Sequence, residues 1–366
     1  MKQRILFLGN SYLVIYKFRK ELVEHFVKEG YEVYVSFPNG PFGDGKETSE
    51  KMGCKFIEAN IERRGKNPFS DLKLLYHYVK LIRNVSPNYV FAFTVKCDVY
   101  GGLACRITGT KLVANITGLG KGLVSGWLTR TITSLLYKSA LKNATVVFFQ
   151  NEGDKKFFLE RKLYDGYNIC LPGSGVNLTQ YRVLPYPDAN KIVFTYVARV
   201  MKAKGIEQFL GAAEFLKNKY NHIEFHICGF CEEDYKQVLE EMVAKGTIVY
   251  HGLVDNIIKY IELSHCIVLP SFHPEGISNV LLEGAACGRP LITTDRIGCR
   301  ETMVDGETGF LIKERDTNDL IEKMERFIAM TNDDRMQMGL KGRLWIEKTF
   351  DRNIVVNAYD SVVKSN

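Results

Sequence analysis

The chain has 366 residues, of which 46% are hydrophobic and 25% are charged, and its formal net charge is +7. This length exceeds what one hydrophobic core usually serves, so two globular domains are expected and extensive disorder is excluded. No apolar run in the sequence approaches the roughly 18 to 20 residues that span a bilayer. Residues 1–8 enter an apolar strand without the features of a signal peptide, which favours a cytoplasmic protein.

The positive charge lies in the first half of the chain. Residues 1–182 contain 27 lysines and arginines and 15 acidic residues, whereas the remaining residues contain 22 and 27. The basic half predicts an anionic partner, either a phosphate group, an anionic membrane surface or a nucleic acid, with a solvated basic face as the alternative. The sequence has no RNP, zinc-finger or helix-turn-helix signature, so we expect no nucleic-acid partner.

Short apolar segments alternate with amphipathic segments, a pattern typical of parallel α/β sheets. In the first half we expect strands at 4–9, 32–37, 55–58, 89–93, 111–116, 146–149 and 169–171, and helices at 18–29, 72–85 and 128–141. A stretch rich in proline and glycine, 172–191, then predicts a linker. In the second half we expect strands at 192–198, 224–228, 248–251, 266–270 and 290–293, and helices at 206–218, 233–244, 256–264 and 277–287.

This order predicts two Rossmann-like domains, at 1–182 and 183–350, that face an interdomain cleft. A final helix, at about 351–366, is expected to pack back on the first domain.

The strongest local signal is the segment 271–290, SFHPEGISNVLLEGAACGRP, which follows an apolar strand and opens a helix. Glu275 and Glu283 are eight residues apart, or about 12 Å along a helix. That length is comparable to the span from a sugar to a ribose across a diphosphate. The two carboxylates can accept hydrogen bonds from those two groups, while the helix N-terminus attracts the phosphates. The alternative is one Glu that supports the helix dipole and one that lies on the surface.

Arg199 and Lys204 form the second signal. They follow the first strand of the second half, and α/β sheets bind ligands at the carboxyl ends of their strands. A guanidinium fork and an ammonium point charge can together neutralise a diphosphate leaving group. An exposed basic loop is the alternative.

Three strand ends in the first half are further candidates. Gly9 and Asn10 form a glycine turn without a GxGxxG motif, and Lys96 follows the strand 89–93, where it would suit an anionic acceptor unless it is simply solvated. The sequence NITGLGKG at 115–122 has glycines that allow close approach of an acceptor phosphate or a donor sugar, with a flexible loop as the alternative. The expected acceptor-side residues are Lys96, Asn115, Thr117 and Gly118.

The nine cysteines are odd in number and scattered, which is not the pattern of a disulfide framework. Cys228 and Cys231 form a single CxxC with no second pair at zinc-ligand spacing, so we expect ordinary thiols and no metal site.

The order of the R-x4-KG and E-x7-E motifs resembles the retaining glycosyltransferases of family four, which have the GT-B fold, over nearly the whole chain. Segments 94–101 and 115–120 are similar to the bacterial branch that extends lipid-linked glycan precursors. The resemblance implies an acceptor-binding first domain and a nucleotide-sugar-binding second domain. It implies transfer of a hexose or N-acetylhexosamine from a UDP-sugar, with GDP as the alternative, to an undecaprenyl-diphosphate-linked saccharide in capsule, O-antigen or other surface-polysaccharide assembly, without a cofactor.

By the same resemblance, Arg199 and Lys204 hold the donor diphosphate, Glu275 contacts the donor sugar and Glu283 contacts the ribose. Glu301 matches a family position of structural role. Further donor-site residues are expected at Gly276, Ile277, Ser278, Asn279, Val280, Leu281, Leu253, Gly9 and Asn10.

Many relatives carry a histidine in the loop that matches 115–118, whereas this chain has Asn115 and Thr117, so no histidine there is assigned to catalysis. His251 and His273 lie near the donor motifs in sequence, and we interpret them as packed or solvated. Transfer on one face of the sugar needs positioning and stabilisation of the leaving-group charge. Arg199, Lys204 and the helix N-terminus can supply these, so we expect a metal-independent hexosyltransferase with Arg199, Lys204 and Glu275 as its catalytic groups.

A GT-B sugar-nucleotide epimerase and a non-catalytic nucleotide-sugar binding protein are the alternative functions. Arg63, Arg64 and Lys66, with the segments 72–85 and 126–142, are candidates for contact with an anionic bilayer. Such contact would place the protein on the inner face of the cytoplasmic membrane, whereas core-facing amphipathic helices are the alternative.

Overall fold

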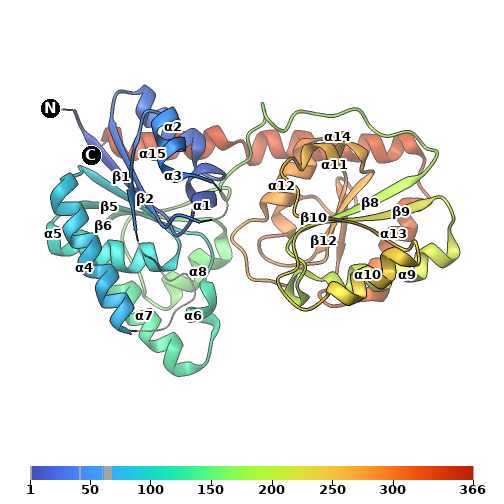
Figure 1. Cartoon of the computed structure of the whole chain (residues 1–366), viewed down its shortest axis with the longest axis horizontal. Coiled ribbons are helices and arrows are strands. Elements are labelled where there is room, and N and C mark those ends of the chain that lie inside the picture. Colours follow the sequence, from blue (N-terminus) through green and yellow to red (C-terminus); the bar gives the residue numbers. More distant parts are fainter. Residues whose placement is uncertain (1, 41–42, 60, 62–67, 366) are drawn as a thin grey trace. The chain divides into compact units, whose positions relative to one another are not determined.

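The computed structural model describes residues 2–40, 43–59, 61 and 68–365 (Figure 1). Arg63, Arg64 and Lys66 lie outside the described residues. The chain forms two compact units, Met1–Ser174 with Arg352–Asn366, and Gly175–Asp351. Within the described residues, no helix combines the length and the apolar character needed to cross a bilayer.

Unit 1 is built on a seven-stranded parallel sheet with the order β3-β2-β1-β4-β5-β6-β7. Its strands are β1 (Arg4–Leu8), β2 (Glu32–Phe37), β3 (Lys55–Glu58), β4 (Tyr89–Phe93), β5 (Lys111–Ile116), β6 (Ala144–Phe149) and β7 (Asn168–Cys170). Its helices are α1 (Tyr12–Tyr16), α2 (Lys20–Lys28), α3 (Gly45–Lys51), α4 (Pro68–Val85), the π-helical turn η1 (Cys97–Gly101), α5 (Gly102–Thr108), α6 (Gly120–Val124), α7 (Trp127–Leu141), α8 (Glu152–Glu160) and α15 (Arg352–Ser365).

Two hydrophobic clusters cover the two faces of this sheet. One joins the sheet to α4, α5, α7 and α8, and the other joins it to α1, α2 and the C-terminal helix α15. Tyr359 of α15 packs its ring against Phe91, Phe93 and Phe148 of the sheet, with centroids 4.5 to 6.2 Å apart. The helix that ends the chain is therefore part of the core of unit 1.

Unit 2 has a six-stranded parallel sheet with the order β10-β9-β8-β11-β12-β13. Its strands are β8 (Ile192–Val197), β9 (Ile223–Cys228), β10 (Val249–Gly252), β11 (Cys266–Leu269), β12 (Leu291–Thr294) and β13 (Gly309–Ile312). Its helices are the 3-10 turn η2 (Lys202–Lys204), α9 (Ile206–Lys219), α10 (Lys236–Ala244), α11 (Ile258–Leu263), α12 (Asn279–Ala286), the 3-10 turn η3 (Arg300–Thr302), α13 (Thr317–Ile328) and α14 (Asn332–Thr349).

A backbone hydrogen bond joins the two ends of unit 2. The N–H of Val176 donates to the carbonyl oxygen of Phe350 at 2.8 Å, and Val176 forms a parallel bridge with Asp351. Val176, Tyr181 and Leu184 are buried in the core of unit 2. The compact units therefore divide the chain at 174 and 175, eight residues before the predicted boundary, because these apolar side chains attach the linker to unit 2.

The expected α/β class with two Rossmann-like domains is what the structure shows. Each predicted strand is present within two residues of its expected bounds. The predicted helix at 277–287 begins two residues late, at Asn279. Strand β13 and several helices, among them α3, α8, α13 and α14, were not predicted.

Both sheets have one position where the strand order reverses, between β1 and β4 in unit 1 and between β8 and β11 in unit 2. In open parallel sheets, ligands bind outside the carboxyl ends of the strands at such a position. The loops that follow these four strands are therefore the first places to look for a site.

Candidate active site

In unit 2 the loops after β8 and β11 touch each other where the strand order reverses. The N–H of Phe272 donates to the carbonyl oxygen of Ala203 at 2.9 Å. Gly205 has a φ of +76°, and a Cβ atom there would lie 2.0 Å from the carbonyl oxygen of Pro270. Only glycine allows both the left-handed backbone and this close approach. The two predicted motifs are therefore brought together by backbone contacts.

Lys204 and Glu275 form an ion pair across these two loops. Both side chains are largely buried, with 11% and 16% of their surface exposed. Burial lowers the pKa of Lys204 to about 8, and the nearby Arg199 charge acts in the same direction. The structure thus unites a basic residue of the first motif with an acidic residue of the second, 71 positions later.

Arg199 has a partner that the sequence did not reveal. Its guanidinium forms an ion pair with Glu232, in the loop after β9. The hydroxyl of Tyr196 donates to the carbonyl oxygen of Arg199 at 3.1 Å and so helps to fix the loop. Strands β8 and β9 are neighbours, which explains how residues 33 positions apart meet.

Glu275 and Glu283 do not lie on one helix. Helix α12 begins at Asn279, so Glu275 belongs to the preceding loop and only Glu283 is helical. The prediction that Glu275 and Glu283 are about 12 Å apart along one helix is therefore wrong. Glu283 is 5% exposed, and it is the fifth of the eight residues of α12, among buried residues.

A second loop supports the Glu275 backbone. Gly298 has a φ of +91°, and a Cβ atom there would lie 2.8 Å from the carbonyl oxygen of Glu275. The carbonyl oxygen of Gly298 accepts from the Ser278 N–H at 2.8 Å, and its own N–H donates to Glu301 at 2.7 Å. Glu301 thus holds the loop that holds the Glu275 segment, which agrees with its expected structural role.

The other donor-site candidates differ in their surroundings. Ile277, Ser278 and Leu281 are buried, with Ser278 as the N-cap residue of α12. Val280 is half-buried against the unit 2 core, and Leu253, after β10, is exposed. The part of this segment that can contact a ligand is therefore the backbone from Gly276 to Asn279, just before and at the start of α12.

The two histidines named in the sequence analysis differ in their surroundings. His273 Nδ1 lies 3.9 Å from Glu275 Oε1. His251 Nε2 lies 3.3 Å from Nδ1 of His226, and the His251 ring packs on Tyr260 with centroids 4.6 Å apart. His251 is therefore a packed residue, as expected.

In unit 1, Lys96 follows β4 at the point where the strand order reverses. Its ammonium lies 2.8 Å from Oδ1 of Asp71 on α4, and the hydroxyl of Tyr100 donates to the other carboxylate oxygen at 2.8 Å. Thr94, just before it, has a φ of +83°, which is uncommon for a residue with a side chain. Lys96 is thus held in place by a partner that the sequence did not indicate.

The acceptor-side residue Asn115 has a packing role instead. It is 1% exposed, and its side-chain amide donates to the hydroxyl of Tyr359 on α15 at 2.7 Å. The carbonyl oxygen of the same side chain accepts from Gln150 at 3.4 Å. Thr117 and Gly118 follow at the end of β5, with Gly118 at a φ of +131°.

Sequence reasoning named Asn10 but missed two buried polar side chains that follow β1 and β4, Arg19 and Asp98. Arg19 lies over the Phe93 ring at 4.7 Å, with its Nη2 atom unpaired among the described residues. Neither carboxyl oxygen of Asp98 has a partner at ordinary hydrogen-bond geometry among them, nor has Oδ1 of Asn10. Burial raises the pKa of Asp98 well above its usual range, against weaker opposing effects of the Asn115 N–H and Arg19. Asp98 lies within the segment 94–101, but neither it nor Arg19 was singled out as a site residue.

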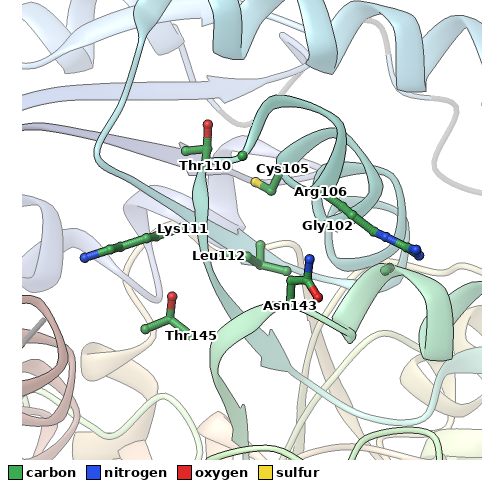
Figure 2. Close-up of a pocket in the computed structure, with 10 residues that line it drawn as sticks. Gly102, Cys105, Arg106, Thr110, Lys111, Leu112, Asn143 and Thr145 are labelled. Atoms are coloured by element: carbon green, nitrogen blue, oxygen red, sulfur yellow. The ribbon is translucent and has the colours of Figure 1, made fainter.

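A surface pocket in unit 1 lies elsewhere, at the amino ends of β5 and β6 (Figure 2). Figure 2 shows the charged ends of Arg106 and Lys111 pointing apart, away from the pocket between them. Because the pocket is at the edge of the sheet opposite to the ligand-binding edge, it belongs to neither candidate site.

Two family models match the chain, one in each unit. Residues 4–151 match the model "Glycosyl transferase 4-like", and residues 191–330 match "Glycosyl transferases group 1". Solved structures share the fold. Sucrose-phosphate synthase from Thermosynechococcus elongatus has a TM-score of 0.82 at 18% identity, covering 100% of this chain and 99% of that one. Anabaena HepE, solved with UDP and glucose, has a TM-score of 0.80 at 17% identity and full coverage of both chains.

The chain is therefore a GT-B enzyme and belongs to the glycosyltransferase family that these two models describe. Among curated relatives, the Campylobacter jejuni N,N'-diacetylbacillosaminyl-diphospho-undecaprenol alpha-1,3-N-acetylgalactosaminyltransferase is 26% identical, covering 99% of this chain and 100% of the relative. The Escherichia coli UDP-Gal:alpha-D-GlcNAc-diphosphoundecaprenol alpha-1,3-galactosyltransferase is 25% identical, covering 80% and 76%. The Staphylococcus aureus capsular polysaccharide glycosyltransferase CapM is 26% identical, covering 80% and 81%.

Proposed function

We propose that the chain is a retaining glycosyltransferase that moves a hexose or N-acetylhexosamine from a UDP-sugar to an undecaprenyl-diphosphate-linked saccharide. The observation that carries the donor part is the meeting of Lys204 and Glu275 at the strand-order reversal of unit 2. The acceptor part is supported by two relatives named for diphospho-undecaprenol acceptors, of which one matches over 99% of this chain.

In this proposal the donor lies over the loops after β8 and β11. Arg199 and Lys204 contact the diphosphate, Glu275 accepts from sugar hydroxyls, and Glu283 accepts from the ribose. Before the donor binds, Glu232 and Glu275 pair with the two cations. Entry of the diphosphate gives each cation a second anionic partner and leaves the Glu275 carboxylate available to the sugar.

The reaction breaks the bond between the anomeric carbon and the diphosphate oxygen, and the nucleoside diphosphate takes the electron pair. An acceptor hydroxyl forms the new bond on the same face, and its proton passes to the departing phosphate oxygen. Two fixed cations stabilise the charge that develops on that oxygen, which is the usual largest contribution of such sites. Acceptor positioning is assigned to unit 1, around Lys96, Thr117 and Gly118.

The affinity for UDP should fall as pH rises above about 8, because Lys204 loses its proton there. The folded-state pKa lies below the ordinary value of 10.5, so between these limits the folded protein holds fewer protons than the unfolded chain and its relative stability rises with pH. Calorimetric titration of UDP across this range measures the Kd directly. Lys204→Arg is the control, since its guanidinium stays charged and should flatten the profile. A wild-type Kd that is constant across this range would contradict the assignment of Lys204 to the diphosphate.

Transfer should persist within about twofold after treatment with EDTA, because two side-chain cations stand at the leaving group. Within the described parts of the chain, no group of three His, Cys, Asp or Glu could hold a metal ion. The measurement is UDP release with EDTA and, separately, with added Mg²⁺ or Mn²⁺. Loss of transfer in EDTA that either ion restores would show that metal independence is wrong.

The test of the function as a whole is a panel of UDP- and GDP-sugars, each incubated with and without a lipid-diphosphate saccharide. Acceptor-dependent nucleotide release and a lengthened saccharide are expected with one UDP-hexose or UDP-N-acetylhexosamine. An epimerised donor without transfer, or binding without any product, would replace the proposal by one of its alternatives.

A further inference from the structure

Large apolar side chains are exposed on two neighbouring parts of unit 1. On α4 they are Phe69, Leu72 and Tyr76, which are 63% to 74% exposed. Spacings of three and four residues place these three on one face of the helix. On α6 and α7 they are Val124, Trp127, Leu128, Ile132 and Leu135, which are 52% to 73% exposed.

These helices belong to the same side of the unit 1 sheet. The opposite faces of α4 and α7 are buried in one hydrophobic cluster, and both helices contact α5 and the turn η1 (Figure 1). The core beneath these helices is therefore formed without the exposed apolar residues. Exposed apolar groups of this extent usually mark an interaction surface.

The segment that carries this surface has an excess of positive charge. Residues 72–150 contain ten lysines and arginines but a single acidic residue, Asp98. Asp98 is 1% exposed and so adds no surface charge. Asp71, at the start of α4, is paired with Lys96. Helices that are rich in cations are complementary to an anionic partner.

Apolar and basic side chains are interleaved along both helices. On α4 the exposed Lys73 lies within the apolar first half, and the exposed Lys80 lies in the second half. On α7 the exposed Arg130 lies among the apolar side chains, and the exposed Lys138 lies in the last turn, followed by Lys142. Aromatic and aliphatic side chains interleaved with lysine and arginine suit an anionic bilayer, whose headgroups attract the cations while the apolar groups enter beneath them.

We propose that the exposed residues of α4, α6 and α7 dock unit 1 on an anionic bilayer, with Trp127 and Phe69 among the headgroups and the basic residues over lipid phosphates. The proposal rests on the proposed function in that the acceptor is anchored in such a bilayer. It names the surface that reaches the acceptor, which neither the reaction nor the relatives indicate.

Trp127 is a built-in probe of this docking. The chain has two tryptophans, and Trp345 belongs to unit 2, where its indole N–H donates to the carbonyl oxygen of Glu301 at 3.2 Å. The emission of Trp127 should shift to shorter wavelength with phosphatidylglycerol vesicles, but not with phosphatidylcholine alone. Brominated lipids should quench it, while Trp345, measured in Trp127→Phe, should stay unquenched.

Vesicle flotation measures the separate contributions of the basic and the apolar residues to binding. Lys138→Gln with Lys142→Gln should weaken binding about tenfold or more, and added salt should weaken wild-type binding further. Leu128→Ser with Leu135→Ser should also release the protein. Phe215→Ser is the matched control, because Phe215 is 50% exposed on α9 of unit 2 and should not matter.

Transfer assays separate this proposal from the function. The Lys138→Gln, Lys142→Gln variant should retain transfer to a short-chain, water-soluble acceptor and lose most transfer to a vesicle-embedded one. Wild-type protein that stays unbound to anionic vesicles while it glycosylates the soluble acceptor overturns the docking and leaves the function intact. A stable dimer in solution that hides Trp127 also overturns it, since a second copy then covers the surface. Absence of transfer to either acceptor overturns the function, whatever the vesicles show.

Discussion

Lys204→Met should lower kcat/KM for sugar transfer by about a hundredfold to a thousandfold, because it removes one of two cations assigned to the leaving group. Glu275→Gln should lower it by a similar factor through loss of hydrogen bonds to the donor sugar. Steady-state UDP release with the lipid-linked acceptor is the measurement. The Lys204 variant should also lose affinity for UDP alone, whereas the Glu275 variant should lose it only for the complete UDP-sugar.

A purely structural pair would give a different pattern. Removing one partner of a buried ion pair leaves the other uncompensated and costs about 3–5 kcal/mol of stability, so each single variant is expected to melt earlier. The double variant Lys204→Met, Glu275→Gln leaves no uncompensated charge and should recover most of that stability. If transfer returns together with stability in the double variant, the pair only supports the fold and its assignment to the donor is wrong.

Gly205→Ala should abolish UDP binding or prevent folding of unit 2. A methyl group there would lie 2.0 Å from the carbonyl oxygen of Pro270, so the loop that carries Lys204 must move away from the loop that carries Glu275. The strain of a left-handed backbone adds about 1–3 kcal/mol. Thermal unfolding of the protein, and UDP titration at a temperature where the variant is folded, measure the two effects.

Gly246 provides the matched control in the same unit. It has a φ of +69°, and a Cβ atom there would meet nothing within 4 Å. Gly246→Ala therefore carries the backbone strain without the collision, and it should lower the melting temperature modestly while UDP affinity stays at the wild-type level. Equal effects of the two substitutions would show that contact between the loops is not what positions Lys204.

The sequence predicted well what depends on local pattern. Apolar segments such as 192–198 and 266–270 became parallel strands, and the basic and acidic motifs that follow them meet because β8 and β11 are neighbours. The start of α12 was placed too early, since Ser278 is held by Gly298 from a distant loop rather than by helical bonding. The spacing of about 12 Å was a separate error, because it applied the rise of a helix to Glu275, which precedes even the predicted helix at 277–287.

Partners from distant segments could not be predicted. Glu232 and Asp71 have no motif of their own, and they become the counter-ions of Arg199 and Lys96 only through the strand order and helix packing. Asn115 shows the opposite error. It stands in a glycine-rich loop motif that suggests a ligand contact, yet the C-terminal helix, 244 positions later, supplies its hydrogen-bond partner.

The chain enters and leaves unit 2 at one place, where Val176 is hydrogen-bonded to Phe350, while both termini of the protein belong to unit 1. In engineering terms, Gly175–Asp351 is a cassette with its two cut sites side by side. Exchanging this cassette with that of a relative would change, in a single step, the half of the enzyme to which we assign the donor. Shortening the C-terminus would instead damage unit 1, because helix α15 belongs to its core.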